Sequence, residues 1–394
     1  MSEGLGAIMR LLLPTPPQTL FLRACLLDDE TCRAAWQEWQ EWAGNAKALF
    51  VDDWNKLRGM LPLLHVSLSR SGAPVEKGFQ PYLRSAAFYE QLRNRTFLRV
   101  CRAALNALET SRVSAIMLRG AALSATAYPG WGIRHCHDLD LLVSSPQVDL
   151  AINALTQNGF MEFETSPATA EQAVILMHDS GFKVALHRKL LRIAYYRPPL
   201  AKMFERRRPL NVADLTGQML APEDMLLHIC GHASCGTQRC SLSWVADAFL
   251  LIKSQRMLDW RLFCETVAES RLPVPVYAML DYLAQELEAP IPQSALHHLQ
   301  RDAAAAETRA FEAACTGLRR GARGSVSELL GSASDWRTRA LLLRWMLFPS
   351  IECLSWSHPI DGIWKVPVLY LTRPLPWRPG VARSSAAVER PDSL

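Results

Sequence analysis

Two aspartates, Asp138 and Asp140, lie two residues apart in the apolar run Asp-Leu-Asp-Leu-Leu-Val at 138–143. Residues two apart on a β-strand point to the same face, so this spacing predicts two neighbouring carboxylates. Like charges this close repel, and one pKa should rise unless a cation lies between them. Mg²⁺, or Mn²⁺ in its place, suits one or two carboxylates and completes its shell with phosphate oxygens. The pair therefore predicts a metal site, with two merely solvated aspartates on a surface strand as the alternative.

A strand–turn–helix pattern precedes the two aspartates and would position a phosphate beside them. Residues 113–118 form a short apolar run, long enough for one buried strand, and Arg119-Gly120 interrupts it. Residues 121–128 are rich in helix formers, and Pro129-Gly130 ends that helix. Gly120 therefore opens the helix, where exposed backbone N–H groups favour an anion.

The ordered set of these motifs resembles a known family. Arg119-Gly-Ala-Ala-Leu, Tyr128-Pro129, Arg134 and the run at 138–143 are similar to the core of a poorly characterised bacterial nucleotidyltransferase-like family. That family belongs to the DNA polymerase beta-type nucleotidyltransferase superfamily. The resemblance covers roughly residues 18–378. It is strongest at 117–143 and at 222–252, where Pro222–His228, Trp244 and Asp247 match a second family pattern.

The resemblance implies transfer of a nucleoside monophosphate from Mg·NTP to a hydroxyl group on a small molecule, a protein or a peptide. It gives Asp138 and Asp140 catalytic and metal-binding roles. It assigns nucleotide or phosphate contacts to Arg119, Gly120, Arg134 and His187. Two alternatives stay open: Arg134 forms a salt bridge with Asp138 or Asp140, and His187 is a strand-end residue bonded to backbone.

One position departs from the family pattern. Active members of the superfamily carry a third carboxylate on a neighbouring strand, which we expect two residues before the family's histidine. Here the segment reads Val-Ala-Leu-His-Arg at 184–188, and Ala185 occupies that place. Arg119 also replaces the usual lysine, which keeps the charge but offers a bidentate fork. The alternative function is therefore a catalytically impaired nucleotide-binding or interaction protein of a biosynthetic cluster.

Three other acids could substitute for the missing carboxylate. Asp179 lies at a predicted turn, whereas Glu162 and Glu164 lie on a predicted strand whose facing the sequence leaves open.

Composition limits the remaining function classes. The chain has 394 residues and a net charge of +5, from 43 basic and 38 acidic residues, which is too mild to indicate nucleic-acid binding. Its ten cysteines show no repeating framework and are expected to be reduced. The apolar stretch near the N-terminus is too short for a signal peptide, and no run approaches the ~20 apolar residues of a membrane span. We therefore expect a cytoplasmic protein without a transmembrane segment.

The predicted fold class is α+β, with a small mixed nucleotidyltransferase-type sheet between helical segments. The expected parts are an N-terminal helical segment at 1–108, the core at 109–215, a C-terminal helical segment at 216–345, and a Pro/Trp-rich tail at 346–394 with a disordered end. Within the core we expect a helix at 147–158, a strand at 160–164 and a hairpin at 174–187. Residues 200–218 are interpreted as a connection. Helices are expected from Pro222 and at 243–252, 262–287 and 294–318.

Helical periodicity predicts part of the core. Trp36, Trp39 and Trp42 recur at helical spacing, which is typical of core packing. A later helix is expected to bury one face made of the following residues: Phe88, Leu92, Leu98, Cys101, Leu105 and Leu108.

Clusters of histidine and cysteine raise the question of zinc. Two histidines and three cysteines fall within 228–240: His228, Cys230, His232, Cys235 and Cys240. A structural zinc site needs four nitrogen or sulfur ligands, and this stretch lacks a Cys-x-x-Cys pair. We therefore interpret His228 and His232 as core histidines, and expect the same absence of metal at His135-Cys136-His137.

Overall fold

The computed structural model describes residues 12–306, apart from 52–53, 164–171, 194, 213–214, 236–241 and 256–257, together with residues 336 and 340. The chain divides into two compact units, and the first comprises Met1–Phe163 and Gln172–Gly324. Glu164, Cys240 and the predicted tail at 346–394 lie outside the described residues.

The N-terminal part of the first unit is helical, as predicted. Its elements are α2 (Pro16–Leu26), α3 (Asp29–Ala43), α4 (Ala46–Val51), the 3-10 helix η1 (Trp54–Met60), α5 (Leu61–Ser71) and α6 (Gln80–Thr110). Local sequence explains several starts: Gln18 accepts a hydrogen bond from the backbone N–H of Thr15 at the start of α2, and the Asp28 side chain accepts from two backbone N–H groups of α3.

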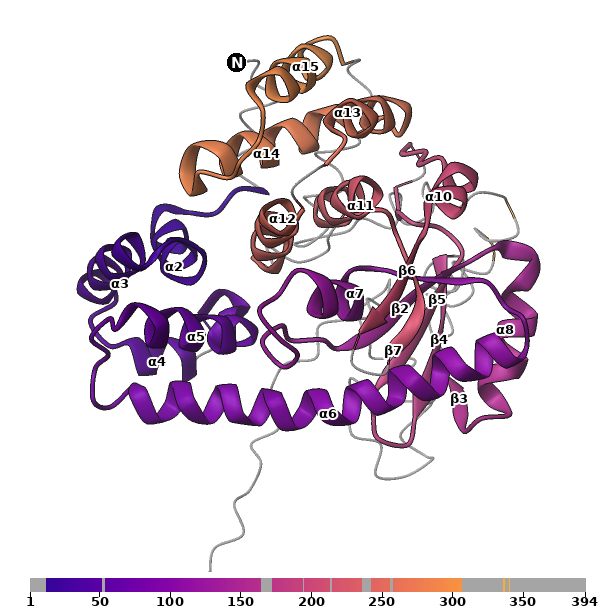
Figure 1. The fold of residues 1–394 in the computed structure, drawn as a ribbon, viewed down its shortest axis with the longest axis horizontal. Coiled ribbons are helices and arrows are strands. Elements are labelled where there is room, and N and C mark those ends of the chain that lie inside the picture. The colour runs from indigo at the N-terminus through magenta and orange to yellow at the C-terminus, as the bar shows by residue number, and fades with distance from the viewer. Residues whose placement is uncertain are drawn as a thin grey trace, which may run out of the picture. The chain divides into compact units, whose positions relative to one another are not determined.

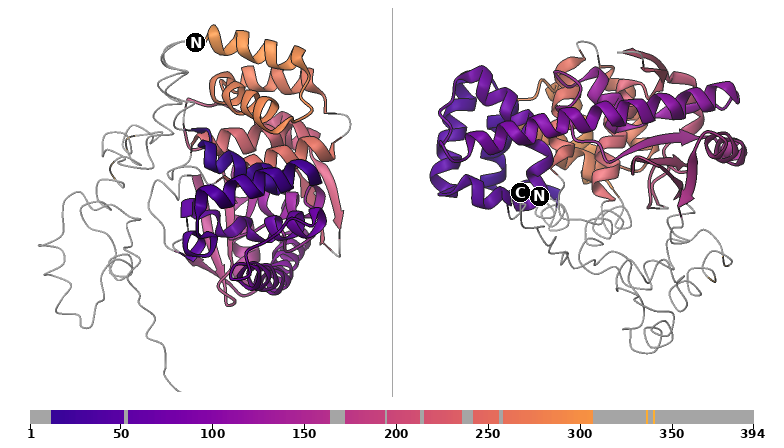
Figure 2. Two further views of the ribbon diagram at one scale, coloured as in Figure 1. Left: turned by 90° about the vertical axis from the view of Figure 1, so that its left-hand side faces the viewer. Right: turned by 90° about the horizontal axis from the view of Figure 1, so that it is seen from below.

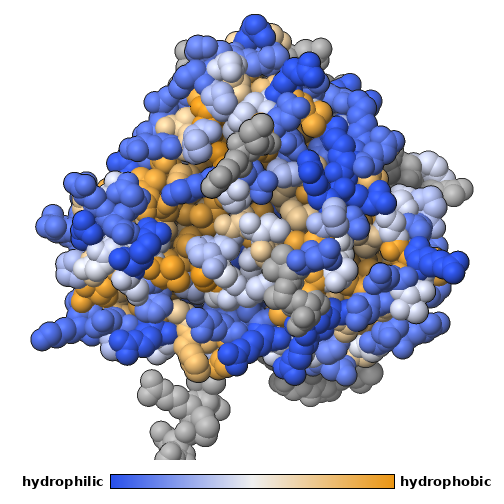
Figure 3. Space-filling view, viewed as in Figure 1, coloured by the Kyte–Doolittle hydropathy of each residue, from blue (hydrophilic) through white to orange (hydrophobic). Residues whose placement is uncertain are grey.

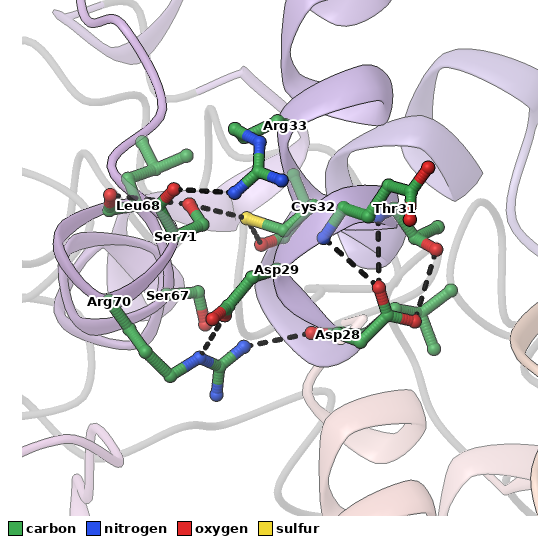
Figure 4. A network of polar contacts seen from close by, with 12 residues as sticks. Asp28, Asp29, Thr31, Cys32, Arg33, Ser67, Leu68, Arg70 and Ser71 are labelled. Atoms are coloured by element: carbon green, nitrogen blue, oxygen red, sulfur yellow. Dashed lines mark hydrogen bonds and ion pairs between the residues drawn. The ribbon is translucent and has the colours of Figure 1, made fainter.

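A polar network joins α3 to α5 (Figure 4). Arg70 donates to Asp29 at 2.6 Å and to the carbonyl of Leu27 at 2.8 Å. Arg33 donates to the carbonyl of Ser71 at 2.8 Å, which satisfies an acceptor at the end of α5. These contacts set the two helices side by side.

Aromatic residues fill the core of this helical part. Trp36 stacks on Trp39 with ring centroids 5.0 Å apart, and Phe50 stacks on Phe79 at 5.5 Å. Trp36 and Trp39 are fully buried, as their spacing predicts. Trp42, by contrast, is 50% exposed in the last turn of α3.

The predicted buried face of α6 is wrong in its first half. Phe88 is 60% exposed and Leu92 is 45% exposed, whereas Glu90 and Asn94 are buried. Counting apolar residues alone misses this face, because two of its positions hold polar side chains that find partners inside the protein. In its second half α6 buries Cys101, Leu105 and Leu108 as predicted.

A mixed sheet of seven strands forms the centre of the unit. The strands are β1 (Ala115–Met117), β2 (Asp138–Val143), β3 (Phe160–Phe163), β4 (Ala173–His178), β5 (Lys183–His187), β6 (Arg208–Val212) and β7 (Leu215–Met219), in the order β3-β4-β5-β2-β1-β7-β6. β2 is parallel to β5 and antiparallel to β1. The hairpin of β4 and β5 is confirmed.

Residues 200–218 are not a plain connection. They form the short helix α10 (Leu200–Arg206) and most of the β6–β7 hairpin, and β7 pairs in parallel with β1. β6 and β7 carry polar residues and a proline, so apolar and polar residues alternate little along them. Their strand conformation is stabilised by pairing, of β7 with β1 and of β6 with β7. The sheet therefore runs past the predicted end of the core at residue 215.

Helices surround this sheet. α7 (Arg119–Thr126) follows β1 and contacts β2, and η2 (Ser145–Gln147) leads into α8 (Val148–Thr156). α6 runs from the N-terminal helices to the sheet, where it contacts β7 and α8 (Figures 1 and 2).

The C-terminal helices are α11 (Pro222–Ser234), α12 (Ser243–Ser254), α13 (Trp260–Glu269), α14 (Pro273–Leu287) and α15 (Gln293–Ala304). The helix predicted over 262–287 is two helices, because Arg271 takes a left-handed conformation with φ 61° and Pro273 starts the next helix.

The surface of the described part is mixed. On the face seen in Figure 1, apolar residues gather toward the middle and left, within a hydrophilic rim (Figure 3). Among the described helices, none combines the length and apolar character needed to cross a bilayer.

Candidate active site

Asp138 and Asp140 lie on one face of β2, a central strand. Burial alternates at the start of this strand, with Leu139 fully buried and both aspartates partly exposed. The alternation is the period-2 pattern of a strand with one open face. The structure therefore brings the two carboxylates together as the spacing predicts.

The surroundings of the two carboxyl groups shift their pKa values in opposite directions. Burial, together with the charge of Asp140, raises the pKa of Asp138 to about 6. Burial would also raise the pKa of Asp140, but a hydrogen bond and positive charge from His187, with the charge of Arg119, outweigh it and hold that pKa well below its usual range. Asp140 is thus firmly ionised, whereas Asp138 titrates near neutrality.

Arg119 and Gly120 form the first residues of α7, beside this pair. Nη2 of Arg119 lies 3.6 Å from Oδ2 of Asp140, and Nε of Arg119 is buried without a hydrogen-bond partner. A Cβ on Gly120 would lie 3.6 Å from the carbonyl oxygen of Asp138. That is an ordinary contact distance, so packing within the chain does not by itself require glycine at this position.

The His187 side chain binds the carboxylate of Asp140, so the alternative in which it is bonded to backbone is wrong. Its Nε2 donates to Oδ1 of Asp140 at 2.8 Å. The side chain comes from the end of β5, where His187 is the register partner of Leu142. Its other ring nitrogen, Nδ1, is buried and has no hydrogen-bond partner.

Ala185 lies directly beside Asp140. The two residues are register partners in the parallel pair β2–β5, and partners in such a pair point to the same face. Ala185 is 2% exposed. The position expected for a third carboxylate is therefore next to the aspartate pair, and it holds a methyl group.

The possible substitutes for that carboxylate lie elsewhere. Glu162 is on β3, with β4 and β5 between it and β2, and its side chain is exposed. Asp179 is exposed in the turn between β4 and β5.

Arg134 binds neither Asp138 nor Asp140. Its Nε and Nη2 each donate to Asp247 on α12 at 2.7 Å, and Tyr128 donates to the same carboxylate at 2.8 Å. The remaining nitrogen, Nη1, approaches the carbonyl oxygen of His135 at 3.3 Å. The guanidinium therefore braces the loop before β2 against α12, and the alternative of a salt bridge to Asp138 or Asp140 is wrong.

The histidines next to the pair belong to another network. His135 donates to Glu90 of α6 at 2.6 Å, and its second nitrogen lies 3.2 Å from Nδ1 of His137. Glu90 also accepts from Arg93 at 3.0 Å. Within the described residues, no group of three or more His, Cys, Asp and Glu side chains is arranged to hold a metal ion.

Two histidines of α11 also reach this region. They lie on the helix that packs against α7, which begins with Arg119. Burial lowers the pKa of both histidines well below the ordinary value, and the charges of Arg119, Asp140 and His187 also act on it. Their apolar surroundings in the sequence favour a core interpretation, and no spacing rule connects them to residues about a hundred positions earlier. Asp247 and Glu90 were missed as partners for the same reason.

Comparisons with known proteins place this chain in a family. No curated protein matches the chain. A crystal structure of an antigenic nucleotidyltransferase-like protein from Paracoccidioides brasiliensis matches 51% of this chain and 95% of its own, with 17% identity and a TM-score of 0.34. The family model described as uncharacterised nucleotidyltransferase matches residues 51–288, which is more than half of the chain. The chain therefore belongs to the uncharacterised nucleotidyltransferase family.

Proposed function

We propose that the protein binds Mg·NTP at the Asp138–Asp140 face of β2 and transfers a nucleoside monophosphate to a hydroxyl acceptor. The acceptor hydroxyl belongs to a small molecule, a protein or a peptide. The observation that carries this proposal is the pairing of the two carboxylates beside the start of α7, where Arg119 and Gly120 lie. Family membership supports the reaction class.

The donor set at this face fits a divalent metal. Asp138 carries a raised pKa because it is buried near the negative charge of Asp140. A hard cation between the two would relieve that repulsion, and oxygen donors are the ligands that Mg²⁺ prefers. Asp138 and Asp140 would hold the ion, which when bound polarises phosphate oxygens.

The residues around the pair suit a triphosphate. Arg119 carries a planar fork of N–H donors that matches phosphate oxygens. The first N–H groups of α7 have no partner within their own helix and can donate to a ligand. His187, through its hydrogen bond, holds the Asp140 carboxylate in a fixed orientation.

The proposed transfer needs no reactant other than Mg·NTP and the hydroxyl acceptor. The acceptor oxygen attacks the α-phosphorus, the bond from that phosphorus to the bridging oxygen breaks, and pyrophosphate leaves. The hydroxyl proton passes to a base or to water. Arg119 would bind the phosphate oxygens of the substrate.

Thermal melting tests the binding part of the proposal. Mg·NTP should raise the melting temperature of the wild type by mass action. The double variant Asp138→Asn with Asp140→Asn should lose that shift. A shift that persists in the double variant contradicts the assignment.

The register of Ala185 favours a second candidate, a protein that binds Mg·NTP and transfers slowly or not at all. Ala185→Asp places a carboxylate beside Asp140 and should raise pyrophosphate release, since a positioned base contributes ~10²–10⁴ in rate. The nucleotide-dependent melting shift should change little, because a base acts mainly on the transition state. Wild-type turnover at an ordinary enzymatic rate would rule out this second candidate.

A further inference from the structure

Two histidines on α11, His228 and His232, have no role in the proposed nucleotide site. His228 is 2% exposed, and its ring lies 5.8 Å from that of His232, one helical turn later, in an edge-to-face arrangement. Neither ring has a hydrogen bond to another described residue. The Nδ1 atom of His228 is buried and unpaired. An unpaired buried polar atom lowers the free energy of unfolding unless a ligand forms a hydrogen bond with it.

α11 packs tightly against its neighbours at Gly231, between the two histidines. Gly231 lies so close to Leu191 that a Cβ would approach its Cδ1 at 2.9 Å, and Leu272 lies at 3.2 Å from the same point. The helix cannot rotate without separating this contact. α11 also contacts α7, the helix that begins with Arg119.

The neighbours of the two histidines are the residues of the proposed nucleotide site. α11 packs against α7, the helix that begins with Arg119, and the charges of Arg119, His187 and Asp140 act on the pKa of both histidines. Burial is the largest effect and lowers the pKa of both histidines well below the ordinary value, so both rings are neutral near pH 7. A neutral ring still offers one N–H donor.

Three separate elements each supply a buried nitrogen that has no hydrogen-bond partner among the described residues. They are Nε of Arg119 on α7, Nδ1 of His187 on β5 and Nδ1 of His228 on α11. The Arg119 nitrogen is a donor, and a neutral ring nitrogen donates or accepts according to its tautomer. Arg119 and His187 both flank Asp140, and α11 contacts the helix that begins with Arg119. Buried polar atoms without partners need an explanation, and a ligand with oxygen acceptors supplies one.

We propose that α11 completes the nucleotide site, with His228 and His232 binding oxygens of the triphosphate chain together with Arg119. This inference rests on the proposed function and names the part of the substrate that these residues contact. A half turn of either ring about its Cβ–Cγ bond exchanges the positions of nitrogen and carbon, so an imidazole N–H can face the ligand without movement of the helix.

The test compares binding of two probes, Mg·ATP and inorganic tripolyphosphate with Mg²⁺, by calorimetry. His228→Phe keeps a ring of similar size and removes both nitrogens. This substitution should weaken the binding of both probes by the same factor, about tenfold for one lost hydrogen bond to a charged group. His228→Asn, whose amide nitrogen lies near the place of Nδ1, should recover part of the affinity. Melting of the unliganded variants should not fall, because no hydrogen bond within the chain is lost.

Cys230→Ala is the matched control. Cys230 is fully buried on the same helix, two residues after His228, and side chains two apart on a helix do not face the same side. This variant should bind both probes like the wild type. If His228→Phe does not fold, His232→Phe, at a less buried position, carries the same comparison.

The outcomes separate this inference from the proposed function. A wild type that binds neither probe overturns the proposed function and this inference with it. Wild-type binding that His228→Phe leaves unchanged overturns the inference alone, as does an equal loss in Cys230→Ala. A loss for Mg·ATP without a loss for tripolyphosphate would place the histidines at the nucleoside and reject the phosphate contact.

Discussion

Two clusters of charged residues lie close together in this protein, and they differ in how completely their atoms are paired. In the first, Asp247 accepts from both Arg134 and Tyr128, and each nitrogen of the Arg134 guanidinium has an acceptor. In the second, Asp138 and Asp140 repel each other, and Arg119 and His187 each keep an unpaired buried nitrogen. The first cluster is complete within the chain, whereas the second is not.

This difference separates structure from function. A buried ion pair with every hydrogen bond made can hold two elements in place, and here it holds the loop before β2 on α12. A cluster with repelling charges and unpaired donors lowers the free energy of unfolding. Such clusters are typical of sites that bind a ligand. Removing charge should therefore have opposite effects in the two clusters.

The largest expected effect is on the complete cluster. Asp247→Asn leaves the Arg134 guanidinium buried without its counter-charge, which should cost about 3–5 kcal/mol in the free energy of unfolding. Urea unfolding measures this. The double variant Arg134→Met with Asp247→Leu should be more stable than Asp247→Asn, because no charge is left buried. A loss below about 1 kcal/mol in Asp247→Asn would show that the pair is not the brace inferred here.

The same substitution should have the opposite sign in the incomplete cluster. Asp138→Asn, measured with chelator present, should stabilise the unliganded protein by about 1–2 kcal/mol at pH 7, because the raised pKa makes the ionised form unfavourable in the folded state. Since the pKa of Asp138 is raised to about 6, the gain should be full above that pH and absent below the ordinary value near pH 4. Destabilisation of similar size to that in Asp247→Asn would remove the contrast between the clusters.

A smaller effect is expected at Glu90, which joins α6 to the loop before β2. Burial would raise the pKa of Glu90, but the hydrogen bond from His135 and the charge of Arg93 lower it overall. A lowered carboxyl pKa adds stability that is present above the unfolded value near 4.3 and is lost as the pH falls through the folded value. Glu90→Gln should therefore cost about 1 kcal/mol at pH 7 and progressively less below pH 4.

The control for that measurement is Glu109→Gln, an exposed position on the same helix. It should show no pH-dependent difference from the wild type. Equal effects at both positions would mean that the general charge of α6, and not the contact with His135, governs the result.

Much of the central fold could be predicted from local pattern. The strand at 138–143, the hairpin of β4 and β5 and the helix start at Pro222 follow from apolar runs and from a proline in the first helical turn. The helix predicted to open at Gly120 begins one residue earlier, at Arg119. β6 and β7 could not be predicted, because their polar sequences form strands only by pairing: β7 pairs with β1, and β6 pairs with β7. The buried face of α6 was missed for a related reason: Glu90 and Asn94 are buried because partners from distant parts of the chain or the same helix satisfy them.

For the candidate site, the sequence by itself determined which carboxylates share a face and which position lacks one. Strand periodicity is local, so Asp138, Asp140 and the gap at Ala185 follow from spacing and family resemblance. Only the tertiary structure decided the partners: Asp247 for Arg134, Asp140 for His187, and α7 for the helix α11 that carries His228 and His232. These contacts join residues tens to more than a hundred positions apart, and only the packing of helices on the sheet sets which of them meet.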